Sequence, residues 1–193
     1  MSTLKHFQYG DSTGALLQLD ERISAAHSDP AATQNIEREL IEVLESDVSL
    51  AAKQEACRRL SRIGTDDSVE ALGSLLKSDD PHLAEAACYA ISRRESTAAT
   101  GALVAALSRP ADPGLVAIAN LLGDREAADA TGKLIELIES SAPPVRDAAI
   151  AALGKIATSE ALAACHAALD RGHSEAKHAL LESAQRTEQR RLG

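Results

Sequence analysis

A repeat of 31 residues constrains the fold of this chain more than any other feature of its sequence. Between Asp47 and Arg171, positions 31 apart carry side chains of the same kind, without insertions or deletions. Such a period is typical of a solenoid, in which each repeat buries its apolar face against its neighbours. The recurring positions form five series: Leu60, Ile91, Leu122 and Leu153; Ala56, Ala87, Ile118 and Ala149; Cys57, Cys88, Ala119 and Ile150; Leu72, Leu103, Leu134 and Cys165; and Leu76, Leu107, Ile138 and Leu169.

Each repeat is predicted to be two antiparallel helices joined by a short turn. In the first repeat we expect a helix over residues 48–64, ended by Gly64 in the left-handed conformation. Residues 65–68 then supply oxygens that cap the second helix. Asp80 before Pro81 is a typical helix start and opens the next repeat. The third repeat is predicted to open at 112–114, and the fourth at Pro143 and Pro144.

The predicted fold is all-α, a right-handed α–α superhelix organised as one continuous domain. Residues 1–46 form a lead-in and a capping helix pair, with helices from Asp11 or Ser12 to about His27 and from about Pro30 to Glu45. Residues 47–172 form four repeats, and 173–193 form a terminal half-repeat. We expect Leu180, Leu181 and Ala184 in the core of that last helix, and a polar tail that frays.

Composition supports closely packed helices. The sequence has no Trp, one Phe and two Tyr (Phe7, Tyr9 and Tyr89), so its hydrophobic content is mostly aliphatic. A core poor in aromatic side chains argues against a sandwich or a barrel. Cys57 and Cys88 take the same place in neighbouring repeats, where stacked helices lie about 8–10 Å apart, too far for a disulfide. All three cysteines are therefore predicted to be small buried hydrophobes.

The formal charge of −9 excludes general nucleic-acid binding, because a net-acidic surface repels phosphate backbones. No apolar run approaches the ~20 residues of a membrane span, and residues 1–10 lack the apolar core of a signal peptide. The chain as written is therefore expected in the cytoplasm, or in the periplasm or outside the cell if it is part of a longer exported protein. The sequence leaves the oligomeric state open.

No catalytic, cofactor or metal site is predicted. His173 and His178 are five residues apart, which does not align two ligands on one helical face. Ser174, His178 and Glu182 share a face, but an exposed helix offers a nucleophile no oxyanion hole. Ser74 and Lys77 match a Ser-x-x-Lys pattern whose companion motifs are missing.

The stretch VRDAAIAALGKIA (145–157) resembles HEAT repeats, specifically the short bacterial type named after phycobilisome lyases, and the resemblance covers residues 47–184. A narrower similarity is to the HEAT array of large multi-domain bacterial proteins. The resemblance implies a scaffold without catalytic residues. No histidine is followed by Glu, the ligand pair of the HEAT-repeat di-iron hydroxylases. The narrower similarity is carried by Lys53, Cys57, Arg58, Leu60, Ile63, Gly64, Thr65, Asn120, Leu122, Gly123 and Arg125.

Two surfaces are candidates for binding a partner. The first is an arginine ridge at the ends of two neighbouring first helices, although positive charge there also complements the helix dipole. The second is the outward face of the second helices, where small residues and a few acids would let another segment approach closely. The candidate residues are Arg58, Arg62, Arg93 and Arg94 on the ridge, and Glu70, Ser74, Lys77, Glu136 and Glu139 on the second helices.

We therefore expect a non-catalytic scaffold that docks a protein partner or a sister domain on these two surfaces. Two alternatives stay open. One is a lyase-like accessory protein that holds a tetrapyrrole or another planar ligand, although aromatic residues for stacking are scarce. The other is a passive spacer whose length is its function.

Overall fold

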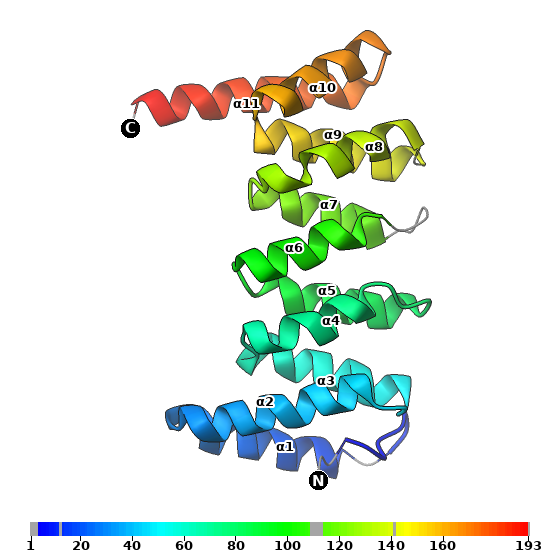
Figure 1. The fold of residues 1–193 in the computed structure, drawn as a ribbon, viewed down its shortest axis with the longest axis vertical. Coiled ribbons are helices and arrows are strands. Elements are labelled where there is room, and N and C mark those ends of the chain that lie inside the picture. The colour runs from blue at the N-terminus through cyan, green and yellow to red at the C-terminus, as the bar shows by residue number, and fades with distance from the viewer. Residues whose placement is uncertain (1–3, 12, 109–113, 141, 193) are drawn as a thin grey trace. The chain divides into compact units, whose positions relative to one another are not determined.

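The protein is an all-α helical solenoid. A computed structural model describes residues 4–11, 13–108, 114–140 and 142–192, which form eleven α-helices and no strand (Figure 1). The predicted cap residue Ser12 and the turn residues Asp112 and Pro113 lie outside the described residues. The helices are α1 (Gly14–Ala25), α2 (Pro30–Glu45), α3 (Leu50–Ile63), α4 (Val69–Leu75), α5 (Pro81–Ser92), α6 (Thr97–Ala106), α7 (Gly114–Asp124), α8 (Thr131–Ser140), α9 (Pro143–Ile156), α10 (Ser159–Asp170) and α11 (Ser174–Leu192).

The chain forms two compact units, residues 1–102 and 103–193. In the first unit α3 packs against α2 and α5, and α4 packs against α2 and α5. In the second unit α9 packs against α7, α8, α10 and α11. First helices therefore pack side by side within each unit, and α4, α8 and α10 pack beside them.

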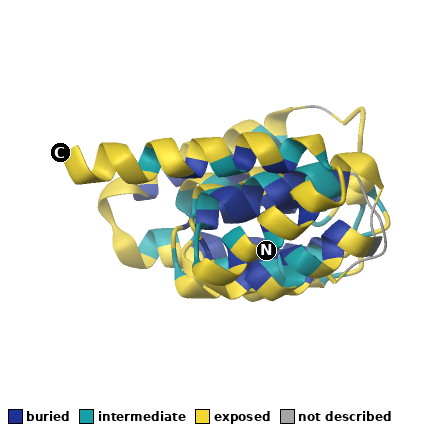
Figure 2. Cartoon of the chain, turned by 90° about the horizontal axis from the view of Figure 1, so that it is seen from above, coloured by how far each residue is buried: buried dark blue, intermediate teal, exposed yellow. Residues whose placement is uncertain are grey.

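The predicted core register is confirmed by burial. Leu60, Ile91, Leu122 and Leu153 are each 0% exposed, and the helices carry buried and exposed residues on opposite sides (Figure 2). Two predicted core positions differ. Cys88 is only half-buried, and Leu169, close to the end of α10, is 37% exposed.

Helix starts follow local capping chemistry. The carboxylate of Asp29 accepts hydrogen bonds from the backbone N–H groups of Ala31 and Ala32, and that of Asp80 accepts from Leu83 N–H at 2.7 Å. Both acids precede a proline at the first helical position, as was predicted for Asp80. In the first repeat the helix begins two residues later than expected, because Ser49 is its N-cap and accepts from Ala52 N–H.

Gly64 ends α3 as predicted, but not in the left-handed conformation. Its φ of −64° and ψ of 152° are extended and open to any residue. Glycine is needed at position 64 because there is no room for a side chain. A Cβ would lie 2.7 Å from the carbonyl oxygen of Leu60 and 2.8 Å from Oγ of Ser68, and it would collide with the guanidinium of Arg94.

The N-terminal lead-in is held against the first repeat. Leu4 is fully buried, and the hydroxyl of Ser49 donates to the carbonyl oxygen of Phe7. The Tyr9 hydroxyl donates to Oε1 of Gln54 on α3. These contacts place Tyr9 beside α3.

The terminal helix differs from its prediction in two respects. Leu181 is 53% exposed and Ala184 is exposed, whereas the buried residues of α11 are Ala176, Ala179 and Ser183. No second helix follows within the described residues, so α11 buries only the face turned toward α9 and α10. The tail expected to fray is helical as far as Leu192. It is tied down by Arg186, which donates to Gly154 O at 2.7 Å, and by an Arg190–Glu126 ion pair.

The different burial of the three cysteines predicts different rates of alkylation. Burial raises the pKa of Cys57 to about 12 and that of Cys165 to about 11. We expect both thiols to resist iodoacetamide at pH 8 in the folded chain, while the half-buried Cys88 reacts. Mass spectrometry of the alkylated peptides checks this. Equal labelling of the three cysteines without denaturant would contradict the burial.

The raised pKa of Cys57 also determines how the stability of the fold changes with pH. Between pH 9 and 12 the folded chain keeps a proton on Cys57 that the unfolded chain releases, so this group's stabilising contribution is lost as the pH rises through that range.

Candidate interaction surfaces

The outward faces of the second helices are exposed at every predicted position. In the first unit these include Glu70 and Ser74 on α4 and Lys77 just after it; in the second they include Glu136 and Glu139 on α8. The remaining outward positions are Gly101, Ala105 and Ser108, Gly132, and Ala163, Ala167 and Asp170, and all of them are exposed.

This face carries small residues and weak ion pairs. A Cβ added to Gly101 or to Gly132 would meet no atom within 4 Å, so the backbone there lies open. Nζ of Lys133 lies 2.9 Å from Glu136, and Arg171 pairs with Glu139. Exposed pairs of this kind contribute little to stability and can exchange partners at small cost.

The arginine ridge is exposed at three of its four positions. The side chain of Arg58 is 63% exposed and that of Arg62 is 58% exposed, and Arg93 is also exposed. Two of these cations already face carboxylates of this chain. Arg58 contacts Glu55 at 2.7 Å, and Arg62 contacts Asp20 at 3.4 Å.

Arg94 does not belong to the exposed ridge, which corrects the sequence-based prediction. It is 8% exposed, and its guanidinium donates to the carbonyl oxygens of Leu60 and Ala90. Its Nε donates to Thr65 O at 3.2 Å. The carbonyl oxygen of Leu60 also accepts from Gly64 N–H at 2.9 Å, so Arg94 adds a second donor at the end of α3. Near the end of α5, where carbonyl groups lack intrahelical partners, the same cation donates to Ala90.

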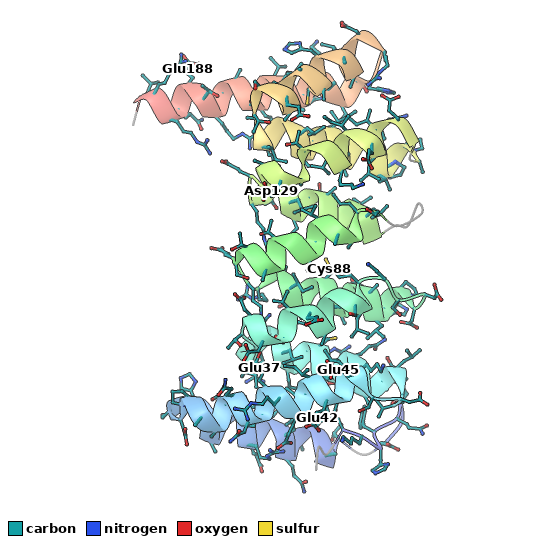
Figure 3. The ribbon with its side chains drawn as sticks, viewed as in Figure 1. Glu37, Glu42, Glu45, Cys88, Asp129 and Glu188 are labelled. Atoms are coloured by element: carbon teal, nitrogen blue, oxygen red, sulfur yellow. The ribbon has the colours of Figure 1, made fainter. Side chains whose placement is uncertain are left out.

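A buried acid lies close to this cation. Glu37, on the side of α2 toward α3 (Figure 3), is 0% exposed. Its carboxylate accepts from Thr65 N–H at 2.6 Å and from the Thr65 hydroxyl. Burial lowers the pKa of Arg94 below its ordinary value, and the charges of Glu37 and Asp66 oppose that shift. The sequence signal for Glu37 was its spacing from Leu40 and Leu44, which places it on the buried face of α2.

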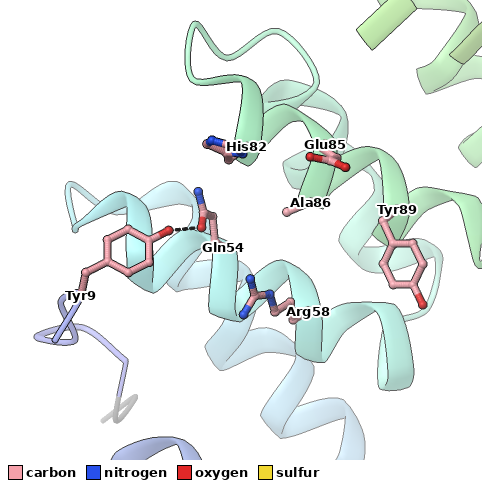
Figure 4. A pocket seen from close by; sticks show the side chains of 7 residues that line it. All are labelled: Tyr9, Gln54, Arg58, His82, Glu85, Ala86 and Tyr89. Atoms are coloured by element: carbon pink, nitrogen blue, oxygen red, sulfur yellow. Dashed lines mark hydrogen bonds between the residues drawn. The ribbon is translucent and has the colours of Figure 1, made fainter. Parts of the chain in front are cut away.

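A groove of about 680 Å³ lies on the side of α3 and α5 in the first unit. It was not predicted from the sequence. Both tyrosines of the chain line it, and Tyr9 comes from the lead-in outside the repeats (Figure 4). Its lining residues are Tyr9, Gln54, Arg58, His82, Glu85, Ala86 and Tyr89.

Neither a metal cluster nor a membrane-crossing helix is found in the part of the chain that the structure describes. No group of three or more His, Cys, Asp or Glu side chains among the described residues could hold a metal ion. None of the helices formed by those residues is long and apolar enough to cross a membrane.

Comparison with known proteins finds a likeness to HEAT repeats in part of the chain. The family model for HEAT repeats matches residues 37–119. The crystal structure of an engineered protein is similar to this chain with a TM-score of 0.54 and 20% sequence identity, over 95% of this chain and 94% of the other. At that identity the likeness concerns the fold alone. No curated protein matched the sequence.

Proposed function

We propose that this chain is a non-catalytic interaction scaffold, because it is a helical solenoid and its residues 37–119 match the family model for HEAT repeats. It docks a protein partner or a sister domain on a surface that exists before binding. HEAT repeats generally mediate protein interactions, and stacked repeats offer extended surfaces for this purpose. We further propose that the repeats are of the short bacterial type named after phycobilisome lyases, on the strength of residues 145–157.

One observation carries the proposal: the outward faces of the second helices are exposed throughout and rich in small side chains. Small residues let a partner segment approach the helix backbone closely. The scaffold is already helical, so binding costs little ordering entropy on this side of the interface. The acids Glu136 and Glu139 add charge that selects a basic or neutral partner segment.

The arginine ridge contributes in a smaller role. Arg58 and Arg62 already face Glu55 and Asp20, so an acidic partner residue must compete with charges of the chain itself. For a partner on the second helices, rim charges such as Arg62 and Arg93 affect the association rate and the choice of partner more than the affinity. Arg94 takes no part, because it is buried.

The test is quantitative affinity capture from the native cell extract with the purified chain as bait. Two variants probe the two surfaces: Glu136→Lys with Glu139→Lys for the second helices, and Arg58→Glu, Arg62→Glu and Arg93→Glu together for the ridge. Lys177→Glu, at an exposed position of α11, serves as a control for charge reversal. Circular dichroism checks that every variant keeps its helical content.

We expect a partner that the wild-type chain and the control capture equally and that the second-helix variant loses. The ridge variant should reduce capture less. Capture that no variant changes would contradict binding on these surfaces. No enrichment over an empty matrix would favour the passive-spacer alternative.

A further inference from the structure

The groove beside α3 and α5 is lined by side chains of both helices and by Tyr9. Gln54 and Arg58, one turn apart, stand on α3. His82, Glu85 and Tyr89 stand on α5, with the small side chain of Ala86 between them (Figure 4). A volume of about 680 Å³ holds several side chains of a bound segment but not a folded domain. This volume suits an extended peptide.

Aromatic residues gather at this groove and are otherwise rare. Only 2% of the chain is aromatic, yet Tyr9 and Tyr89 both line the groove, with 72% and 58% of their surface exposed. The hydroxyl of Tyr9 donates to Gln54, which fixes its ring at one end. Tyrosine and arginine are enriched among the residues that dominate binding energy at interfaces.

Hydrogen-bond donors converge at the end of the groove near Tyr9. The Oε1 atom of Gln54 is occupied by the Tyr9 hydroxyl, so its amide N–H₂ is the group left to bind a ligand. The guanidinium of Arg58 points toward Gln54 and Tyr9, and the His82 ring lies above them in the view of Figure 4. Arg58 uses one N–H group on Glu55 and has others to donate.

The donors in this cluster outnumber the carboxylates that lie close enough to pair with them. Glu55 contacts both Arg58 and Arg59, and only 12% of its side chain is exposed. Glu85 lies on α5 away from the Tyr9 end (Figure 4). A carboxylate placed among Gln54, Arg58 and His82 would therefore meet donors on three sides.

We propose that this groove binds an extended peptide segment of a partner through an acidic side chain. The Asp or Glu carboxylate accepts from Arg58 and Gln54, with His82 beside it. Neighbouring aliphatic side chains of the segment pack on Ala86 and on the tyrosine rings, a contact that a free ion would not make. The inference deepens the proposed scaffold function, on which it rests, by assigning one surface and the chemistry of its ligand.

Fluorescence anisotropy with the full chain tests this inference. The probe is a fluorescein-labelled dodecapeptide, (Gly-Ser-Leu-Glu)₃, and the control peptides replace Glu by Gln or by Lys. We expect the Glu peptide to bind at least about tenfold more tightly than the Gln peptide, since hydrogen bonds to charged groups are the stronger ones. The Lys peptide should bind more weakly still.

Variants of the chain then locate the site. Arg58→Gln is expected to weaken binding of the Glu peptide about tenfold or more, and Tyr89→Ala about fivefold or more. Arg38→Gln removes the same charge from an exposed arginine on α2 that does not line the groove, and it should leave binding within about twofold. Circular dichroism confirms that each variant is folded.

Equal binding of the Glu and Gln peptides, tighter binding of the Lys peptide, or equal losses in the Arg58 and Arg38 variants would each overturn the inference. Failure here is distinct from failure of the scaffold function. A partner captured from the extract and lost on changing Glu136 and Glu139 would stand even if no acidic peptide entered this groove.

Discussion

Replacing Leu122 by alanine is expected to lower the free energy of unfolding by about 2–5 kcal/mol. Leu122 is 0% exposed on α7, which packs against α9. The substitution removes buried methyl groups and leaves a cavity that the surrounding side chains fill only in part. Urea denaturation followed by far-UV circular dichroism measures the loss.

Leu181→Ala is the matched control, because it makes the same chemical change at a position that is 53% exposed. Its effect should stay within about 0.5 kcal/mol. If Leu122→Ala unfolds at nearly the wild-type urea concentration, the register that places Leu60, Ile91, Leu122 and Leu153 in one buried row is wrong.

Replacing Arg94 by methionine is expected to cost about 3 kcal/mol of stability. The buried guanidinium donates to the carbonyl oxygens of Leu60, Ala90 and Thr65. Methionine fills similar space without donating, so these carbonyls lose charged partners and Glu37 loses a nearby cation. The same urea titration measures the change.

Two further variants make this prediction specific. Arg93→Met changes the neighbouring exposed arginine and should cost no more than about 0.5 kcal/mol. Adding Glu37→Gln to the Arg94 variant should recover part of the loss, because it removes the buried charge left without a nearby cation. Equal losses for Arg93→Met and Arg94→Met would contradict the burial of Arg94.

The repeat made the fold and core predictable. Positions 31 apart occupy equivalent places, so one apolar series such as that of Leu60 identifies a buried row without any knowledge of distances. The same reasoning placed the second-helix positions outward, because they fall opposite the apolar face. Periodicity is lost at an end of the array, which is why the buried face of α11 was assigned incorrectly.

Arg94 shows what periodicity cannot supply. It stands where the first and fourth repeats have Ile63 and Ile156, and a charged residue at that place suggested the surface. In the structure it reaches the carbonyl oxygen of Leu60, and Gly64 leaves the space for it. That contact forms because the turn after α3 and the turn after α5 lie close together, and the sequence of neither turn alone indicates it.

The groove was beyond prediction for a related reason. One of its walls is completed by Tyr9, which belongs to no repeat and whose position depends on a hydrogen bond to Gln54. The repeat pattern located Gln54 and Tyr89 on helices, but nothing in the sequence indicated that Tyr9 of the lead-in would lie beside them.

Photo-crosslinking in the native extract tests the scaffold function most directly. A benzoylphenylalanine replaces Ser74 on the outward face of α4 in one sample and the exposed Lys177 on α11 in another. The scaffold account predicts a discrete, heavier protein adduct from position 74 and none from position 177. No adduct from position 74, or the same adducts from both positions, would contradict it.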